Sequence, residues 1–128
     1  MLLDTTFLID LQRGLQSESQ DAALRFLQSR PEAPVFISLI SWLEFAEGYS
    51  DEQEDACRQF LSRFRVVLPD LATAWRASRL SRALRAGGRR LADHDLWIAA
   101  TAIETRVPLV TKNARHFRAI PELDVIGY

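Results

Sequence analysis

The chain has 128 residues, of which 48% are hydrophobic, and its net charge of −1 gives no overall reason to expect a polyanionic partner. No apolar run reaches the roughly 20 residues that cross a bilayer, and the only cysteine, Cys57, excludes an internal disulfide and a cysteine-based zinc site. The first residues carry no basic segment ahead of a hydrophobic stretch, so we expect no signal peptide and a place in the reducing cytoplasm.

Two short apolar segments in the first half of the chain predict buried strands. Met1–Leu3 is apolar and is followed at once by polar residues, and Val35–Ile37 follows a segment with two prolines. The apolar residues after the first strand recur at helical spacing until Gly14, a residue type that often follows a helix end. Three further helices are expected before residue 65: one capped by Ser19 that reaches about Arg30, one capped by Ser38 that reaches about Tyr49, and one that begins near Asp51 and reaches about Phe64.

The second half of the chain continues this alternation of short strands and helices. Arg65–Leu68 predicts a third strand, and Asp70 is suited to cap a long helix that ends near Arg85, before a pair of glycines. Another helix is expected from about Asp93. The remaining predicted elements are a strand at Val107–Val110, a short helix from Asn113 to about Ala119, and a weak final strand at Val125–Ile126.

The alternation of strands and helices predicts an α/β fold for one domain that spans residues 1–128. Strands that are separated by helices form a mainly parallel sheet with helices on both faces. Ligand sites of such sheets lie at the carboxyl ends of the strands. Asp4 directly follows the first predicted strand, so we expect its carboxylate at this edge.

Three more polar residues are predicted to lie near the same edge. Glu44 lies in the helix after the second strand, Asp95 lies near the start of an otherwise apolar helix, and Asn113 follows the fourth strand. Each has an ordinary alternative: Asp4, Asp95 and Asn113 suit helix starts, and Glu44 suits a surface. Together, carboxylates that converge at one edge repel one another, and a divalent cation relieves that repulsion. Oxygen ligands without paired histidines favour Mg²⁺ or Mn²⁺ over zinc.

Several other chemistries lack their sequence motifs. The chain has no G-x-x-x-x-G-K-[ST] loop and no G-x-G-x-x-G after a strand, so nucleotide binding of these kinds is not indicated. It has no G-x-S-x-G nucleophile elbow. A phosphatase with an aspartate nucleophile would have a second aspartate two positions after Asp4, where this chain has Thr6.

Four stretches of the chain, in order, resemble a known family. They are "LLDTTFLID", "ISLISWLEFAEG", "DHDLWIAATAIE" and "PLVTKNARHF", and together with their spacing they extend the likeness over essentially the whole chain. The family is the PIN-domain ribonucleases of the VapC toxin type. The resemblance implies a three-layer α/β/α domain with a mainly parallel sheet of four or five strands.

The resemblance also implies the activity and the residues that carry it. The activity is that of a Mg²⁺- or Mn²⁺-dependent endoribonuclease in which water attacks the phosphodiester and leaves a 5′-phosphate. Asp4, Glu44 and Asp95 match the three main acidic positions of the family, and Asn113 stands at the fourth, where an aspartate is common. The resemblance therefore leaves the number of metal ions open.

Two further groups of residues could contact the substrate. Thr5, Thr6 and Thr111 could bond to the carboxylates or to the phosphate. Residues 1–64 carry 11 acidic and five basic residues, whereas residues 65–120 carry four acidic and 11 basic residues, ten of them arginines. This asymmetry indicates either a nucleic-acid contact or a solvated helix face. The arginines expected nearest the site are Arg82, Arg85, Arg89 and Arg90.

The family resemblance implies protein partners as well as RNA. A VapB-like antitoxin is expected, with a homodimer of the toxin and a heterotetramer or larger assembly with the antitoxin, and no membrane association. Apolar residues on two predicted helices could leave an exposed groove beside the acidic site for such a partner. They are Leu8, Leu11, Leu15, Trp42, Phe45 and Tyr49.

Two alternative functions stay open at this stage. Asn113 at the fourth acidic position also fits a catalytically weak or inactive PIN-fold module that binds RNA or a protein. A metal-dependent DNA nuclease would need the same acidic residues, because water attack does not use the ribose 2′-hydroxyl.

Overall fold

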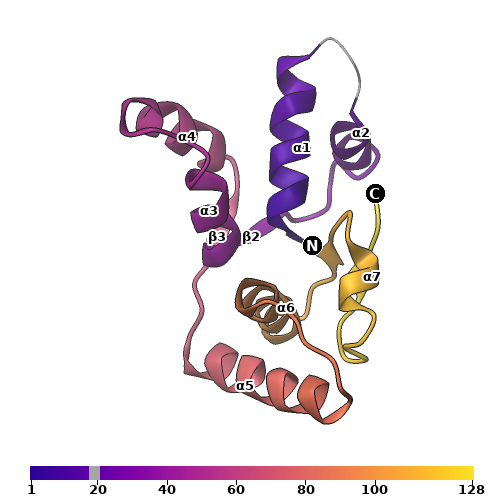
Figure 1. Ribbon diagram of the computed structural model, residues 1–128. Coiled ribbons are helices and arrows are strands. Elements are labelled where there is room, and N and C mark those ends of the chain that lie inside the picture. Colours follow the sequence, from indigo (N-terminus) through magenta and orange to yellow (C-terminus); the bar gives the residue numbers. More distant parts are fainter. Residues whose placement is uncertain (18–20) are drawn as a thin grey trace.

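The computed structural model describes residues 1–17 and 21–128 and has a central parallel sheet of five short strands (Figure 1). The strand order is β3-β2-β1-β4-β5, and all four neighbouring pairs run parallel. The three-layer fold with a parallel sheet is thus confirmed. The strands are Leu2–Leu3 (β1), Phe36–Ser38 (β2), Arg65–Val67 (β3), Leu109–Val110 (β4) and Val125–Ile126 (β5).

Successive residues of the strands face opposite sides of the sheet, and each side has its own core. Leu2 pairs with Phe36 and Leu109, and these three residues pack in one core. Leu3, their neighbour on β1, belongs to the core on the other face. The central strands β1 and β4 are buried on both sides, which explains why their residues are all apolar, whereas the edge strand β3 is exposed and contains Arg65.

Helices cover both faces of the sheet, as Figure 1 shows. One layer contains α1 (Thr5–Gln16), α2 (Ala22–Gln28), α3 (Leu39–Ala46) and α4 (Glu54–Leu61), the last preceded by the 3-10 turn η1 (Asp51–Gln53). The other layer contains α5 (Leu71–Ala86), α6 (Asp93–Thr105) and α7 (Ala114–Phe117). None of the helices in the described ranges combines the length and the apolar character that crossing a membrane requires.

Helices α1, α3 and α5, each of which follows a strand, begin at side chains that cap them. Asp4 accepts from the Phe7 N–H at 2.9 Å, and Ser38 accepts from the Ser41 N–H at the same distance. These bonds satisfy N–H groups that have no partner in the first turn of a helix. The predicted caps at Ser38 and Asp70 are confirmed. The cap predicted at Ser19 lies outside the described residues, and Asp21 caps α2.

The prediction that the first helix ends at Gly14 is wrong. Helix α1 continues to Gln16, and Gly14 is buried within it. A Cβ atom at Gly14 would lie 2.6 Å from the Cβ of Asp21, closer than two carbon atoms approach. Gly14 therefore allows α1 to approach the start of α2 closely, and it does not mark the end of a helix.

Other predicted boundaries differ from the structure by a few residues. The strand predicted at Val107–Val110 is shorter, because the Val107 N–H donates to the Ala102 carbonyl at the end of α6. That bond forms because Arg106 adopts a left-handed conformation with φ 55°, which turns the chain back over the helix end. Helix α3 ends at Ala46, before Tyr49, and α4 ends at Leu61, before Phe64.

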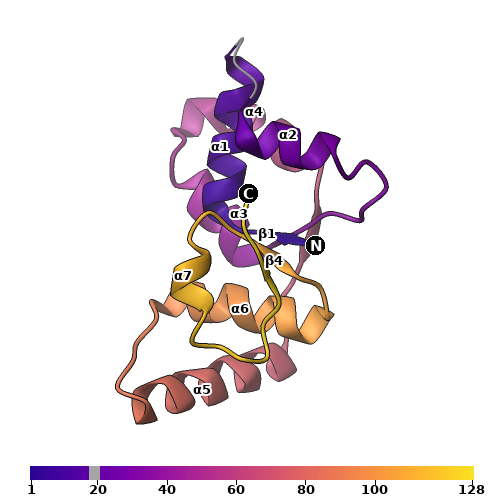
Figure 2. The same cartoon turned by 90° about the vertical axis from the view of Figure 1, so that its right-hand side faces the viewer.

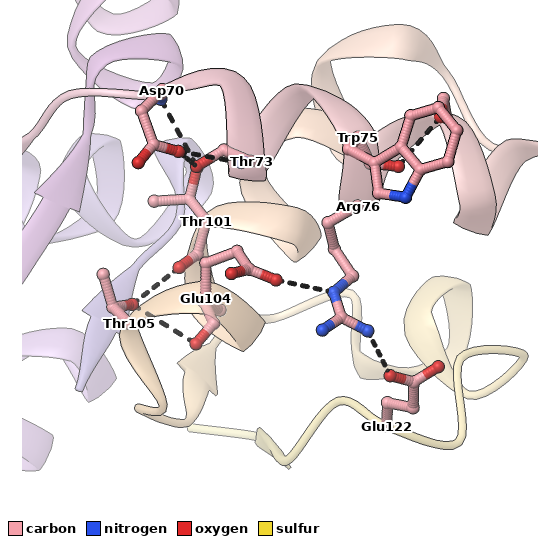
Figure 3. A network of polar contacts seen from close by, with 10 residues as sticks. Asp70, Thr73, Trp75, Arg76, Thr101, Glu104, Thr105 and Glu122 are labelled. Carbon is pink, nitrogen blue, oxygen red and sulfur yellow. Dashed lines mark hydrogen bonds and ion pairs between the residues drawn. The ribbon is translucent and has the colours of Figure 1, made fainter.

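A polar network fixes α5 against α6 and against the segment that leads to β5 (Figure 3). Arg76 on α5 donates to Glu104 of α6 at 2.7 Å and to Glu122 at 2.6 Å. Helices α5 and α6 are neighbours in the chain, and their connection, residues 87–92, lies on the same side of the molecule as α7 in both ribbon views (Figure 2). This side borders the candidate site.

Candidate active site

The four predicted site residues Asp4, Glu44, Asp95 and Asn113 line one cavity of about 330 Å³, here called the acid cavity. They come from the end of β1, from α3, from the first turn of α6 and from the turn after β4. Strand β1 lies between β2 and β4, so the chain changes direction across the sheet at this point. Such switch points are where open parallel sheets form ligand sites.

Asp4 is held in place by hydrogen bonds to both oxygens of its buried carboxylate. Oδ1 accepts from the Thr6 hydroxyl at 2.8 Å and from the Phe7 N–H, and Oδ2 accepts from the Thr111 hydroxyl. Burial raises the pKa of Asp4 above its usual range, these three bonds lower it, and the charge of Asp95 raises it again. The net direction is upward. A positive charge placed in the cavity would thus favour the ionised form of Asp4.

Glu44 connects three helices through its carboxylate. The Thr5 hydroxyl of α1 donates to Oε2, and Nδ1 of His94 from α6 lies 2.8 Å from Oε1. The side chain is 25% exposed, so Glu44 is neither in the core nor on an open surface. Its orientation toward α6 explains how a glutamate two turns into α3 reaches the same cavity as Asp4.

Asp95 lies in the first turn of α6, where the partially positive helix end favours a carboxylate. Its pKa is nevertheless raised, first by burial and then by the negative charge of Glu44, while His116 and His94 act in the opposite direction. Asp93 also lies in this first turn, but it lines a neighbouring cavity and not the acid cavity. The acidic charge of the site therefore comes from Asp4, Glu44 and Asp95, with Glu47 at its margin.

Asn113 lines the acid cavity without serving as a side-chain cap. It occupies the N-cap position of α7, but within the described structure its side chain makes no capping hydrogen bond. Its backbone N–H donates to the Thr111 hydroxyl at 3.0 Å, which is the same hydroxyl that donates to Asp4. The amide of Asn113 is exposed and available to a ligand in the cavity.

The donors of the acid cavity suit a hard cation, although they do not form a complete preorganised metal site. The donor atoms are carboxylate and amide oxygens, and the pKa values of Asp4 and Asp95 are raised mainly by burial and further by the charge of a neighbouring carboxylate. Across residues 1–17 and 21–128, no three His, Cys, Asp or Glu side chains gather closely enough to ligate one ion. Mg²⁺ is commonly bound through only one or two carboxylates and keeps several waters. Asp4 and Asp95 fit that mode.

The structure separates the four predicted arginines. Arg89 and Arg90 lie in the connection between α5 and α6, and Arg85 lies in the last turn of α5, all three beside cavities. Arg82 points elsewhere: its guanidinium lies 5.3 Å from the centre of the exposed Trp75 ring and donates to Ser78.

Only part of the apolar set predicted to border the acidic site is exposed, and half of it lies in the core, as expected for about half of these residues. Leu8, Leu11 and Phe45 are core residues. Leu15 is exposed, and Trp42 and Tyr49 are half-buried and border a small cavity of about 160 Å³ between α3 and α4.

Sequence reasoning missed the role of α7 in the site. His116 lines the acid cavity, and Arg115 and Arg118 line an adjoining one. The available signal was the spacing in this short helix, where Phe117 is buried and the polar residues on either side of it must face outward. His94 was missed as a contact of Glu44 because 50 residues separate the two.

Comparison with known proteins identifies similar chains. Residues 1–123 match the family model described as the PIN domain. Ribonuclease VapC1 of Methanocaldococcus jannaschii is 34% identical to this chain, and the match covers 100% of this chain and 86% of that protein. Ribonuclease VapC19 of Mycobacterium tuberculosis is 32% identical, with 95% of each chain covered.

Solved structures give the same result. VapBC2 from Rickettsia felis, bound to a DNA fragment from its promoter, has a TM-score of 0.80 at 25% identity, with 99% of this chain and 97% of that chain covered. A toxin–antitoxin complex from Klebsiella pneumoniae has a TM-score of 0.74 at 33% identity, with 98% and 94% covered. The span that matches the family model contains every residue that lines the acid cavity.

Proposed function

Because this chain belongs to the PIN-domain family, we propose that it is a Mg²⁺- or Mn²⁺-dependent endoribonuclease and the toxin of a toxin–antitoxin pair. One observation carries the proposal. Asp4, Glu44 and Asp95 come from three separate elements and line one cavity at the switch point of the sheet.

The residues of the acid cavity divide the work of hydrolysis among them. Asp4 and Asp95 hold the cation, and the bonds from Thr6, Thr111 and the Phe7 N–H keep Asp4 oriented toward it. When bound, the ion lowers the pKa of a coordinated water and offsets the charge of the phosphate. Glu44, fixed by Thr5 and His94, orients the attacking water and accepts its proton. Asn113 offers an amide to the phosphate at the open side of the cavity.

The products follow from the atom that is attacked. Water adds to phosphorus, the P–O3′ bond breaks, and the proton that the water loses is balanced by the one that the leaving 3′-oxygen gains. The fragment with the new 5′ end keeps the phosphate, and the other fragment ends in a 3′-hydroxyl. The ribose 2′-hydroxyl takes no part, so the choice of RNA over DNA must come from contacts outside the acid cavity.

The partner of this toxin is a VapB-like antitoxin. The solved relatives include a toxin–antitoxin complex and a VapBC assembly bound to promoter DNA. By the same analogy the toxin forms a homodimer in the cytoplasm and joins the antitoxin in a heterotetramer or a larger assembly. Co-expression with a small neighbouring open reading frame should restore growth and yield a complex that purifies together.

Induced expression in bacterial cells tests the activity. We expect growth arrest and a limited set of new RNA ends that carry 5′-phosphates, and neither effect with Asp95→Asn. Harmless expression of a folded protein, with no new RNA ends, would reject the proposal.

A second candidate is a PIN-fold module that binds RNA without cleaving it. Two observations favour it: the fourth acidic position is Asn113, and no three candidate ligands gather closely within the described ranges. The same expression experiment separates the two candidates, since a binding module would bind RNA and leave no new 5′ ends.

A further inference from the structure

Two adjoining cavities beside the acid cavity form a groove that contains five arginines. The cavities have volumes of about 230 and 380 Å³ and adjoin each other, since both are lined by Arg89, Arg90 and the same two leucines. We call this the arginine groove, lined by Arg85, Arg89, Arg90, Arg115 and Arg118. Arg115 comes from α7 and Arg118 is the C-cap residue that follows it, and α7 lies on the same side of the molecule as the α5–α6 connection (Figures 1 and 2).

One residue joins the arginine groove to the acid cavity. His116 of α7 lines both, so the two cavities adjoin at this residue. The floor of the groove includes Leu84 and Leu91, which offer an apolar surface between the charged walls.

The charge of the groove is largely uncompensated. Within residues 1–17 and 21–128 none of its five arginines forms an ion pair, whereas Arg58 and Arg76 elsewhere are paired with glutamates. Asp93 is the one carboxylate among the lining residues of the two cavities. Exposed arginines without ion-pair partners are available for phosphate, to which a guanidinium donates two parallel hydrogen bonds.

The opposite margin of the acid cavity carries the other sign of charge. Glu47 lies at that margin, at the end of α3. Four more acidic residues follow within eight positions: Asp51, Glu52, Glu54 and Asp55. A polyanion is therefore attracted on the α7 side and repelled on the α3 side.

We infer that the RNA strand occupies one side of the acid cavity only, running over His116 into the arginine groove with its backbone phosphates on Arg89, Arg90, Arg115 and Arg118. This rests on the proposed function, since the scissile phosphate must lie at the acid cavity. Arg82 is then not a substrate contact, because its side chain lies against Trp75, and Arg115 of α7 and Arg118 at the end of α7 are added. An acidic segment of a protein partner is the competing occupant.

Binding without cleavage tests the groove. The affinity of the protein for a labelled single-stranded RNA is measured in EDTA at several salt concentrations, for the wild type and for R115Q/R118Q. The slope of log K against log salt is negative, and each lost phosphate contact should reduce its magnitude by about 0.7. The slope of the double variant should therefore be shallower by about 1.4. The control R65Q/R79Q removes the same charge from exposed arginines outside both cavities and should keep the slope.

The one-sided path has its own test. Short RNAs are extended only on the 5′ side or only on the 3′ side of the mapped cleavage position. One extension should tighten binding to the wild type, and this gain should disappear in R115Q/R118Q. Equal gains from both extensions, or an unchanged salt slope in the double variant, would overturn the inference.

The outcomes separate this inference from the proposed function. A wild type that cleaves RNA, with a double variant that binds RNA like the control, would reject the groove and keep the nuclease. A wild type that neither binds nor cleaves RNA would reject both. If R115Q/R118Q keeps its RNA affinity and loses affinity for the antitoxin, the groove belongs to the protein partner, which also overturns the inference.

Discussion

The Thr111 hydroxyl donates a hydrogen bond to Oδ2 of Asp4, although 107 positions separate the two residues in the sequence. The bond connects the ends of β1 and β4, the two strands at the switch point of the sheet. The same hydroxyl accepts from the Asn113 N–H, so one threonine orients two residues of the acid cavity. The position of the Asp4 carboxylate, which we propose to be catalytic, thus depends on the pairing of the first and fourth strands.

Replacement of Thr111 by valine keeps the shape of the buried side chain and removes both bonds. A hydrogen bond to a charged group contributes about 1.5–3 kcal/mol, so we expect the cleavage rate to fall about tenfold to a hundredfold. Thr111→Ser is the matched control because it keeps the hydroxyl. A valine variant that folds and cleaves at the wild-type rate would show that Asp4 needs no support from β4.

Replacement of Asp4 by asparagine should abolish cleavage and stabilise the metal-free protein at neutral pH. Burial raises the pKa of Asp4, so between its usual value of 3.8 and its folded value the folded state binds more protons than the unfolded state. The contribution of Asp4 to the free energy of unfolding therefore falls as the pH rises through that range. The asparagine side chain can still accept from the Phe7 N–H.

Denaturant unfolding in EDTA at several pH values between 4 and 8 measures this effect. Asp4→Asn should show a smaller loss of stability with rising pH than the wild type, and added Mg²⁺ should stabilise the wild type more than the variant. The same dependence of stability on pH in the wild type and in Asp4→Asn would contradict the raised pKa of Asp4.

Glu44 is expected to act in catalysis while His94 only positions it. Glu44→Gln keeps the hydrogen bonds to Thr5 and removes the charge, so cleavage should fall by at least about a hundredfold, the usual range for loss of a general base. His94→Asn should lower the rate much less, because Thr5 still holds Glu44. Single-turnover rates of the two variants give the comparison, and equal losses would assign His94 a direct part in the reaction.

Gly14 should tolerate no side chain, for a structural reason unrelated to catalysis. Gly14→Ala places a Cβ atom against Asp21, which caps α2, so the start of α2 must move. Overpacking of this kind costs about 1–3 kcal/mol, partly offset by the better helix propensity of alanine, and we expect Tm to fall by about 4 °C. Gly127→Ala is the control, because no described atom lies within 4 Å of its added Cβ. A Tm that rises for Gly14→Ala would show that α2 moves without cost.

Local sequence signals predicted most of the fold. Strands such as Leu2–Leu3 are short and apolar, and the residues that follow them, Asp4 and Ser38, cap the next helix by a bond within three residues. Signals of this range are visible in the sequence. Gly14 and Val107 were misread because tertiary structure decides their roles: a close approach between α1 and α2 in one case, and a left-handed helix end in the other.

The site was only partly predictable for the same reason. Asp4 and Asn113 follow strands, so the topology alone brings them to one edge. The contact between His94 and Glu44 depends on how α6 docks against α3, and the contribution of Arg115 and Arg118 depends on how the short α7 lies beside the α5–α6 connection. No local pattern in the sequence contains these relationships.

The most direct test of the account is the rate at which the purified protein cleaves a labelled single-stranded RNA with and without Mn²⁺ or Mg²⁺. We predict cleavage that requires the ion, yields 5′-phosphate ends, and is lost in the folded Asp95→Asn variant. Cleavage that persists in EDTA, or an Asp95→Asn variant as active as the wild type, would contradict the assignment of the acid cavity as the active site.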